Sequence, residues 1–300
     1  MHDHGHHGST TRAFAVVTLI NLAYTVVEAG YGFATDSLAL LSDALHNFGD
    51  VLGLALAWGA AVIAKRPPTE RHTYGWRRAT LLSPLANALL LVGFAGALSW
   101  EALRRLDAPP QIPALPVIVV AAIGIAVNLG AAWLLREGHS HDLNRRGAFL
   151  HLLADAAVSL AAVLAGIGML QLGWRWLDPA TGLLVGAVVA LGAFSLLRDA
   201  FNAAMDAVPA AIDQAQVRAW LAAQDGVSAV HHLHIWSLGA GEVAMTAHLV
   251  RLADGDHDAF LDRIGDELDQ RFGINHPTLQ IERGSSCEHD RHDRAPHGAH

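Results

Sequence analysis

Charged residues and cysteine are both scarce in this 300-residue chain. Only 16% of its residues are charged, against about 25% in an ordinary soluble domain, whereas 52% are apolar. This balance argues against a soluble globule, and it excludes a disordered chain, which would be poor in apolar residues. The single cysteine, Cys287, excludes a disulfide framework and a four-cysteine metal site within one chain.

Lysine is nearly absent as well, since Lys65 stands against nineteen arginines, a bias that suggests a GC-rich bacterium. Histidine, by contrast, is abundant, with 19 residues. The net charge of −8 belongs to the last third of the chain, where 15 acidic residues face 7 basic ones. An acidic region argues against a nucleic-acid partner, which requires a basic face, and suits the attraction of cations.

Long apolar runs dominate the first 200 residues. A membrane helix needs about 20 mostly apolar residues. Six segments meet this condition, at 13–34, 38–64, 79–103, 113–135, 148–172 and 177–197. Eight Lys and Arg residues lie in the loops after the second and fourth runs, against three in the loops on the other side. This bias predicts a multi-pass membrane protein with both termini in the cytoplasm. In the bacterium that the arginine content suggests, the membrane would be the inner one.

The pattern changes after residue 200. It predicts a helix over 210–223, strands over 227–238 and 243–250, a helix over 257–272 and a last strand over 278–282. This order suggests a small sheet with helices on one side. We therefore predict four parts: a His-rich tail (1–12), a transmembrane transport domain (13–200), a cytoplasmic domain (208–283) and a second His-rich tail (284–300).

Two of the apolar runs carry the same polar pattern, His-x-x-x-Asp. The second run contains His46 and Asp50, and the fifth contains His151 and Asp155. A spacing of four places each pair on one helix face. If the two faces meet, two imidazole nitrogens and two carboxylates form a tetrahedral set that suits Zn²⁺ and similar metals. Ionisable residues within a membrane span are functional by default, so we interpret these four as one metal site.

Asp43 lies two turns before Asp50 on nearly the same face. It either attracts ions at an entrance or serves a structural role by capping the helix. Asn47 and Glu28 are expected to bond between helices or to line the path, and Gly182 and Gly186 form a Gly-x-x-x-Gly pair typical of close helix packing.

Five segments together make the chain similar to the cation diffusion facilitator family of proton-coupled zinc efflux transporters. They are Ser42–Asp50, Tyr74–Arg78, His151–Asp155, His234–Ser237 and His276–Glu282. The resemblance implies six spans, cytoplasmic termini, a ferredoxin-like cytoplasmic domain and a homodimer. It also implies that His46, Asp50, His151 and Asp155 form the transport site, and that metal leaves by alternating access as protons enter.

Family members also bind zinc in the cytoplasmic domain. By position, His231, His248 and Glu282 resemble those ligands, and His234, His276 and Cys287 are possible additions. Strict alternation along the first strand would put His232 and His234 on one face and His231 on the other. Zn²⁺ is thus expected both as the transported substrate and as a regulatory ligand, and the His-rich tails are expected to capture it.

Two other classes of function are weighed against a transporter. A membrane zinc hydrolase is disfavoured because no His-Glu-x-x-His motif occurs and four ligands leave no open coordination position. A zinc sensor or uncoupled channel is not excluded by the sequence. The partners expected are therefore divalent metal ions, protons, the lipid bilayer and a second copy of the chain.

Overall fold

The computed structural model describes residues 5–135, 143–252 and 256–283. The chain divides into two compact units, which are described separately. The first contains residues up to 56 together with 86–197, and the second contains 57–85 together with the residues from 198 onward. The structure does not describe the side chains of several histidines and of the single cysteine. These are His139, His141, Cys287 and the histidines of both predicted tails.

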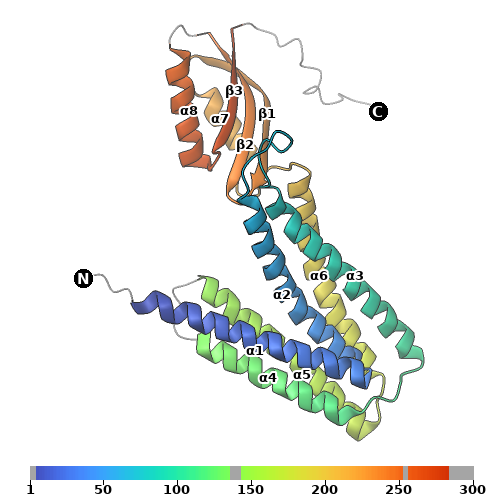
Figure 1. The fold of residues 1–300 in the computed structure, drawn as a ribbon. Coiled ribbons are helices and arrows are strands. Elements are labelled where there is room, and N and C mark those ends of the chain that lie inside the picture. Colours follow the sequence, from blue (N-terminus) through green and yellow to red (C-terminus); the bar gives the residue numbers. More distant parts are fainter. Residues whose placement is uncertain (1–4, 136–142, 253–255, 284–300) are drawn as a thin grey trace, which may run out of the picture. The chain divides into compact units, whose positions relative to one another are not determined.

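The described residues up to 204 form six long helices: α1 (Gly5–Thr35), α2 (Leu38–Ala64), α3 (Ala79–Asp107), α4 (Ala114–Leu135), α5 (Leu143–Leu172) and α6 (Leu177–Ala204). The first unit is made of these helices, apart from the ends of α2, α3 and α6, which belong to the second unit. Among the residues that the structure describes, five of these helices, α2 to α6, are long and apolar enough to cross a membrane. Their large outward-facing apolar side chains suit lipid rather than water. In Figure 1, α1, α4 and α5 lie side by side.

The start of α2 is fixed by a residue of α6. The carboxylate of Asp178 accepts hydrogen bonds from the backbone N–H groups of Leu38 (2.8 Å) and Ala39 (3.3 Å) and from the Ser37 hydroxyl (2.5 Å). Gly182, one turn later on α6, lets the two helices approach, because a Cβ there would stand 2.9 Å from that of Leu38. Asp178, rather than Asp43, therefore caps the helix that carries the first His-x-x-x-Asp pair.

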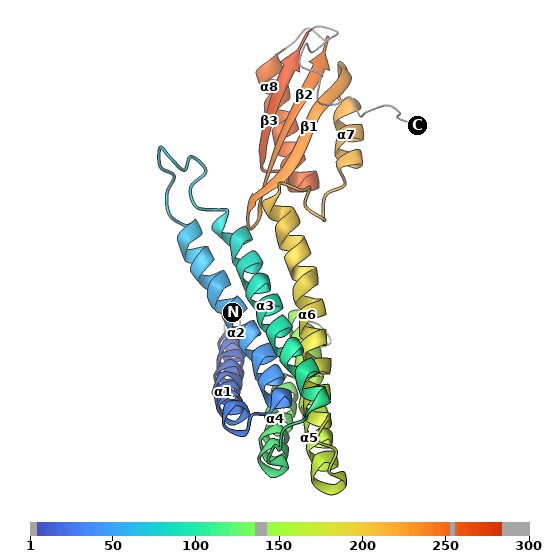
Figure 2. The same ribbon diagram turned by 90° about the vertical axis from the view of Figure 1, so that its right-hand side faces the viewer.

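The second unit contains a small α+β domain built from α7 (Gln214–Ala222), β1 (Val227–Gly239), β2 (Glu242–Arg251), α8 (His257–Phe272) and β3 (His276–Glu282). The strands form one sheet in the order β1-β2-β3, with β1 antiparallel and β3 parallel to β2. Figure 2 shows α7 and α8 packed against this sheet. Their apolar residues, among them Leu221, Ile264 and Leu268, share one core with Ile235 and Met245 of the strands.

The sequence predicted α8 with the bounds that the structure has, since its apolar residues follow a helical period closely. The prediction for α7 was wrong at its start. Residues 210–213 are not helical, because Asp213 acts as the N-cap and accepts hydrogen bonds from the N–H groups of Ala215 and Gln216.

Candidate functional site

The two His-x-x-x-Asp pairs come together inside the first unit. His46 and Asp50 lie one turn apart on α2, and His151 and Asp155 lie one turn apart on α5. The Nε2 atom of His46 stands 3.2 Å from Oδ1 of Asp155. The Nε2 atom of His151 stands 3.0 Å from Oδ2 of Asp50 and 3.6 Å from Oδ2 of Asp155. Each histidine is thus joined to the carboxylate of the other helix.

The four side chains differ in their exposure. Asp155 is 1% exposed and His46 26%, whereas His151 and Asp50 are close to half exposed. Ligand atoms of His46, His151 and Asp155 lie within 4.8 Å of one another, close enough to hold a metal ion. Asp50 approaches this group through His151. The arrangement offers two nitrogen and two oxygen ligands, with an inner end at Asp155 and an outer end at Asp50.

A second candidate cluster lies on the sheet of the α+β domain. Glu282 at the end of β3 contacts His248 of β2 through Oε1 (2.8 Å from Nδ1) and His231 of β1 through Oε2 (3.1 Å from Nε2). Ligand atoms of all three lie within 4.8 Å of one another. Partial burial by itself raises the pKa of Glu282. The hydrogen bond with His248 and the charges of His248 and His231 outweigh this effect, so the pKa of Glu282 is lowered.

The expectation of strict alternation along β1 was wrong. The register with β2 shifts between His231 and His234, and His232 adopts a left-handed backbone conformation with φ of 50°. This bulge places the rings of His231 and His232 on the same side, 5.2 and 4.9 Å from the ring of His248. His232 is not among the ligands predicted from the sequence, and strict alternation would put it on the strand face opposite His231.

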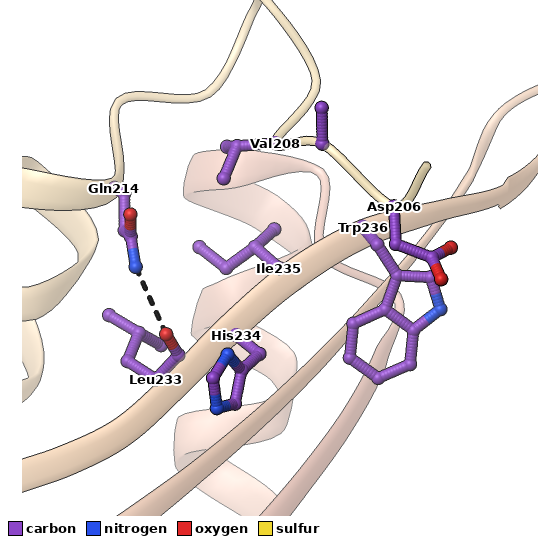
Figure 3. Close-up of a pocket in the computed structure, with 8 residues that line it drawn as sticks. Asp206, Val208, Gln214, Leu233, His234, Ile235 and Trp236 are labelled. Atoms are coloured by element: carbon purple, nitrogen blue, oxygen red, sulfur yellow. Dashed lines mark hydrogen bonds between the residues drawn. The ribbon is translucent and has the colours of Figure 1, made fainter. Parts of the chain in front are cut away.

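The other two histidines predicted for this domain lie elsewhere. His234 is exposed and lines a pocket of about 480 Å³ with Trp236 and Asp206. Figure 3 shows this pocket, where Gln214 of α7 donates a hydrogen bond to the Leu233 carbonyl (3.0 Å). His276 begins β3, and its exposed ring lies 6.2 Å from that of Tyr74. Neither joins the group around Glu282 in the described part of the chain.

Asp43 is fully buried and is held from two sides. It accepts hydrogen bonds from the hydroxyl of Ser159 on α5 (2.9 Å) and from the amide of Asn47 (3.4 Å). Sequence reasoning missed Ser159, although its position four residues after Asp155 places it on the same face of α5.

Comparisons with known proteins cover nearly the whole chain. The family model described as the cation efflux transmembrane domain matches residues 14–203, and that of the cation efflux protein cytoplasmic domain matches residues 209–284. The metal cation efflux system protein CzcD of Cupriavidus metallidurans is 35% identical over 288 residues, covering 96% of this chain and 91% of that protein. The zinc transporter ZitB of Escherichia coli is 34% identical over 289 residues, covering 94% and 92%.

A third relative, the cadmium, cobalt and zinc/H⁺-K⁺ antiporter of Bacillus velezensis, is 32% identical over 287 residues, covering 94% of this chain and 91% of that protein. The solved metal-bound C-terminal domain of CzcD is 33% identical, covers 24% of this chain and 99% of its own, and has a TM-score of 0.22. With matches to both family domains and to full-length relatives, the chain belongs to the cation diffusion facilitator family of metal cation efflux transporters.

Proposed function

We propose that this protein exports Zn²⁺ from the cytoplasm across the bacterial inner membrane by exchange with protons, through alternating access. The convergence of His46, Asp50, His151 and Asp155 carries the proposal, because it joins two nitrogen and two oxygen ligands between α2 and α5. The relatives named as a zinc transporter and as a cadmium, cobalt and zinc antiporter support the same substrate class. Members of this family are transporters and not enzymes.

The ligand chemistry favours exchange of metal for protons. An imidazole binds a metal only when its nitrogen is unprotonated, so metal and protons compete for His46 and His151. The absence of a thiolate from this set suits exchangeable binding, which a transport site needs. The ligands come from two different helices, so a relative movement of α2 and α5 would assemble and open the site.

In the proposed topology α1 joins the five apolar helices as a sixth span, which leaves both termini in the cytoplasm. The domain boundaries proposed are 13–200 for the transport domain and 208–283 for a ferredoxin-like cytoplasmic domain that pairs two copies of the chain. The match to the cytoplasmic-domain family model over residues 209–284 supports this division. The tails 1–12 and 284–300 are proposed to capture zinc.

We assign a regulatory role to the cluster of His231, His248 and Glu282. These side chains supply two imidazoles and one carboxylate at the distances that a metal ion requires. A metal held on this sheet adjusts the activity of the transporter without lying on the transport path. His234 and His276 are the weaker members of the predicted ligand set, because they lie apart from this cluster.

Purified protein in proteoliposomes tests the transport function. With a zinc indicator inside the vesicles and an opposing pH gradient, Zn²⁺ should accumulate above its external concentration, and collapse of the gradient should abolish accumulation. Accumulation that is indifferent to the gradient would contradict proton exchange, and mere equilibration would identify an uncoupled channel. The same assay with Cd²⁺, Co²⁺, Ni²⁺, Fe²⁺ and Mn²⁺ determines the selectivity.

A further inference from the structure

A buried polar cluster lies beside the transport site but contains none of its four ligands. It joins Tyr24 and Glu28 of α1, Asp43 and Asn47 of α2, and Ser159 of α5. The hydroxyl of Tyr24 donates to Oε1 of Glu28 (2.7 Å), while Ser159 and Asn47 donate to the two oxygens of Asp43. Three helices thus contribute to this network, in two hydrogen-bonded groups that meet where the Tyr24 hydroxyl and Ser159 both face Gly124 of α4.

The charges in this network do not balance. Glu28 and Asp43 are both 0% exposed, and in the described part of the chain neither forms an ion pair with a lysine or arginine. Two unpaired negative charges next to each other in an apolar bundle would be very costly. At least one of the two carboxyl groups must therefore carry a proton.

The hydrogen bonds indicate which group carries the proton. Both oxygens of Asp43 accept from a donor, Ser159 or Asn47. The Oε2 atom of Glu28 is buried and receives no hydrogen bond from a described donor. Oε1 of Glu28 accepts from the Tyr24 hydroxyl (2.7 Å), which leaves Oε2 as the one oxygen of the two carboxyl groups without a described partner. A proton on Oε2 of Glu28 removes one of the two buried charges and leaves the donors of Asp43 in place.

The helices make room for this arrangement. Gly124 of α4 faces the hydroxyl of Tyr24, and a Cβ at this position would lie 3.0 Å from Oγ of Ser159. The Val120 carbonyl, one turn earlier on α4, is also within 3.3 Å of the Tyr24 hydroxyl. Close packing of α4 therefore places the Tyr24 hydroxyl beside Ser159.

We propose that Glu28 is a proton-binding residue of the transport cycle, with Asp43 as the carboxylate that positions its proton. This inference rests on the proposed exchange of zinc for protons and places part of that exchange outside the metal ligands. When metal occupies its site, Glu28 gives up its proton and becomes a carboxylate. When metal has left, Glu28 takes up a proton again from the other side of the membrane.

The position of Asp43 supplies the coupling. The titratable groups around Asp43 are Tyr24 and Glu28 from α1, His46 from its own helix and Asp155 from α5. His46 lies less than one turn from Asp43, a rise of about 4.5 Å along α2. A dication bound at His46 and Asp155 therefore favours the ionised form of the neighbouring carboxyl pair, so that metal and the proton on Glu28 oppose each other.

Glu28→Gln tests the proposal in proteoliposomes, because glutamine keeps the shape of the side chain and stays neutral but has no titratable proton to release. Zinc and proton fluxes are measured together, with a zinc indicator and a pH indicator. We expect the variant to retain zinc binding at the transport site while the number of protons moved per zinc falls by one. Thr25→Val, which removes a buried hydroxyl of α1 that bonds only its own helix backbone, should leave the ratio unchanged.

The outcomes separate this proposal from the proposed function. Wild-type protein that shows no proton exchange refutes the function, whereas an unchanged proton-to-zinc ratio in Glu28→Gln refutes only the role of Glu28. A third outcome is that the proton-to-zinc ratio stays constant while zinc transport by the variant no longer depends on K⁺. This result would show that Glu28 and Asp43 hold a monovalent cation, and it would also overturn the proposal.

Infrared spectroscopy of the wild-type protein tests the protonation without any variant. At neutral pH the metal-free protein should show the carbonyl band of a protonated carboxyl group, and this band should weaken on addition of zinc. Incorporation of ¹³C-labelled glutamate should shift the band, and labelled aspartate should not. A band that follows aspartate, or no band at all, would overturn the assignment even if Glu28→Gln fails to fold.

Discussion

Replacement of Asp178 by alanine should both loosen α2 and weaken the proposed transport site, to which α2 contributes His46 and Asp50. The Asp178 carboxylate binds the N–H groups of Leu38 and Ala39 and the hydroxyl of Ser37, and Asp178 and Leu38 are at most 1% exposed. His46 follows Leu38 by eight residues, about 12 Å along the helix. The first turn of α2 therefore supports His46, a proposed metal ligand.

The magnitude follows from the groups that lose their acceptor. An unsatisfied buried donor costs about 1–3 kcal/mol, and loss of a helix cap costs about 0.5–2 kcal/mol. Three donors are affected, but the hydroxyl of Ser37 can turn towards another acceptor and the first turn can relax. We expect a loss of about 3 kcal/mol, which for a protein of this size lowers the Tm by roughly 6–12 °C.

Thermal unfolding of the detergent-solubilised protein, followed by size-exclusion chromatography, measures this effect. The Tm of Asp178→Asn should fall by less than half as much as that of Asp178→Ala, because the amide oxygen of asparagine still accepts from the N–H group of Leu38. Asp107→Ala, at the exposed end of α3, should change the Tm by little. A Tm and a zinc affinity that both remain at wild-type values in Asp178→Ala would refute the idea that α6 fixes the start of α2.

Three further predictions concern the two candidate metal sites and the packing between helices. His46→Asp replaces a nitrogen ligand by a harder oxygen ligand, so the ratio of zinc to manganese flux should fall by at least about tenfold; an unchanged ratio would separate His46 from selectivity. Gly182→Val places its side chain against Leu38, 2.9 Å away at Cβ, and should destabilise the protein by about 1–3 kcal/mol in the same thermal assay; a stable variant would contradict the close packing. Because the pKa of Glu282 is lowered from its ordinary value of 4.5, its contribution to the stability of the metal-free sheet is present above that value and is lost as the pH falls through the lower, folded-state pKa. Hydrogen exchange of β3 should therefore differ between wild type and Glu282→Gln at neutral pH and converge in acid; a difference that persists in acid would contradict this.

The features that the sequence predicted well are those set by local periodicity. The apolar residues of α8 repeat with a helical period, and a spacing of four places His46 with Asp50 and His151 with Asp155 on single helix faces. Such patterns need no knowledge of which elements touch. The long apolar runs likewise predicted helices because lipid requires every backbone group to bond within its own segment.

The features that the sequence did not predict depend on contacts between distant segments. The hydrogen bond of Ser159 with Asp43 joins residues 116 positions apart, and Asp178 reaches the start of α2 from 140 positions away. The bulge at His232 is a backbone irregularity that no alternation pattern contains. These details decide which carboxyl groups are satisfied and which histidines share a ligand cluster.

Zinc flux in proteoliposomes containing Asp50→Ala or Asp155→Ala tests the central claim most directly. Asp155 lies at the buried end of the four-residue set and Asp50 at its exposed end, so the two variants examine both ends. We predict that each variant folds, retains the candidate metal cluster of His231, His248 and Glu282 and loses zinc transport, while Asp107→Ala transports at the wild-type rate. Zinc flux retained in either variant would contradict the assignment of the transport site.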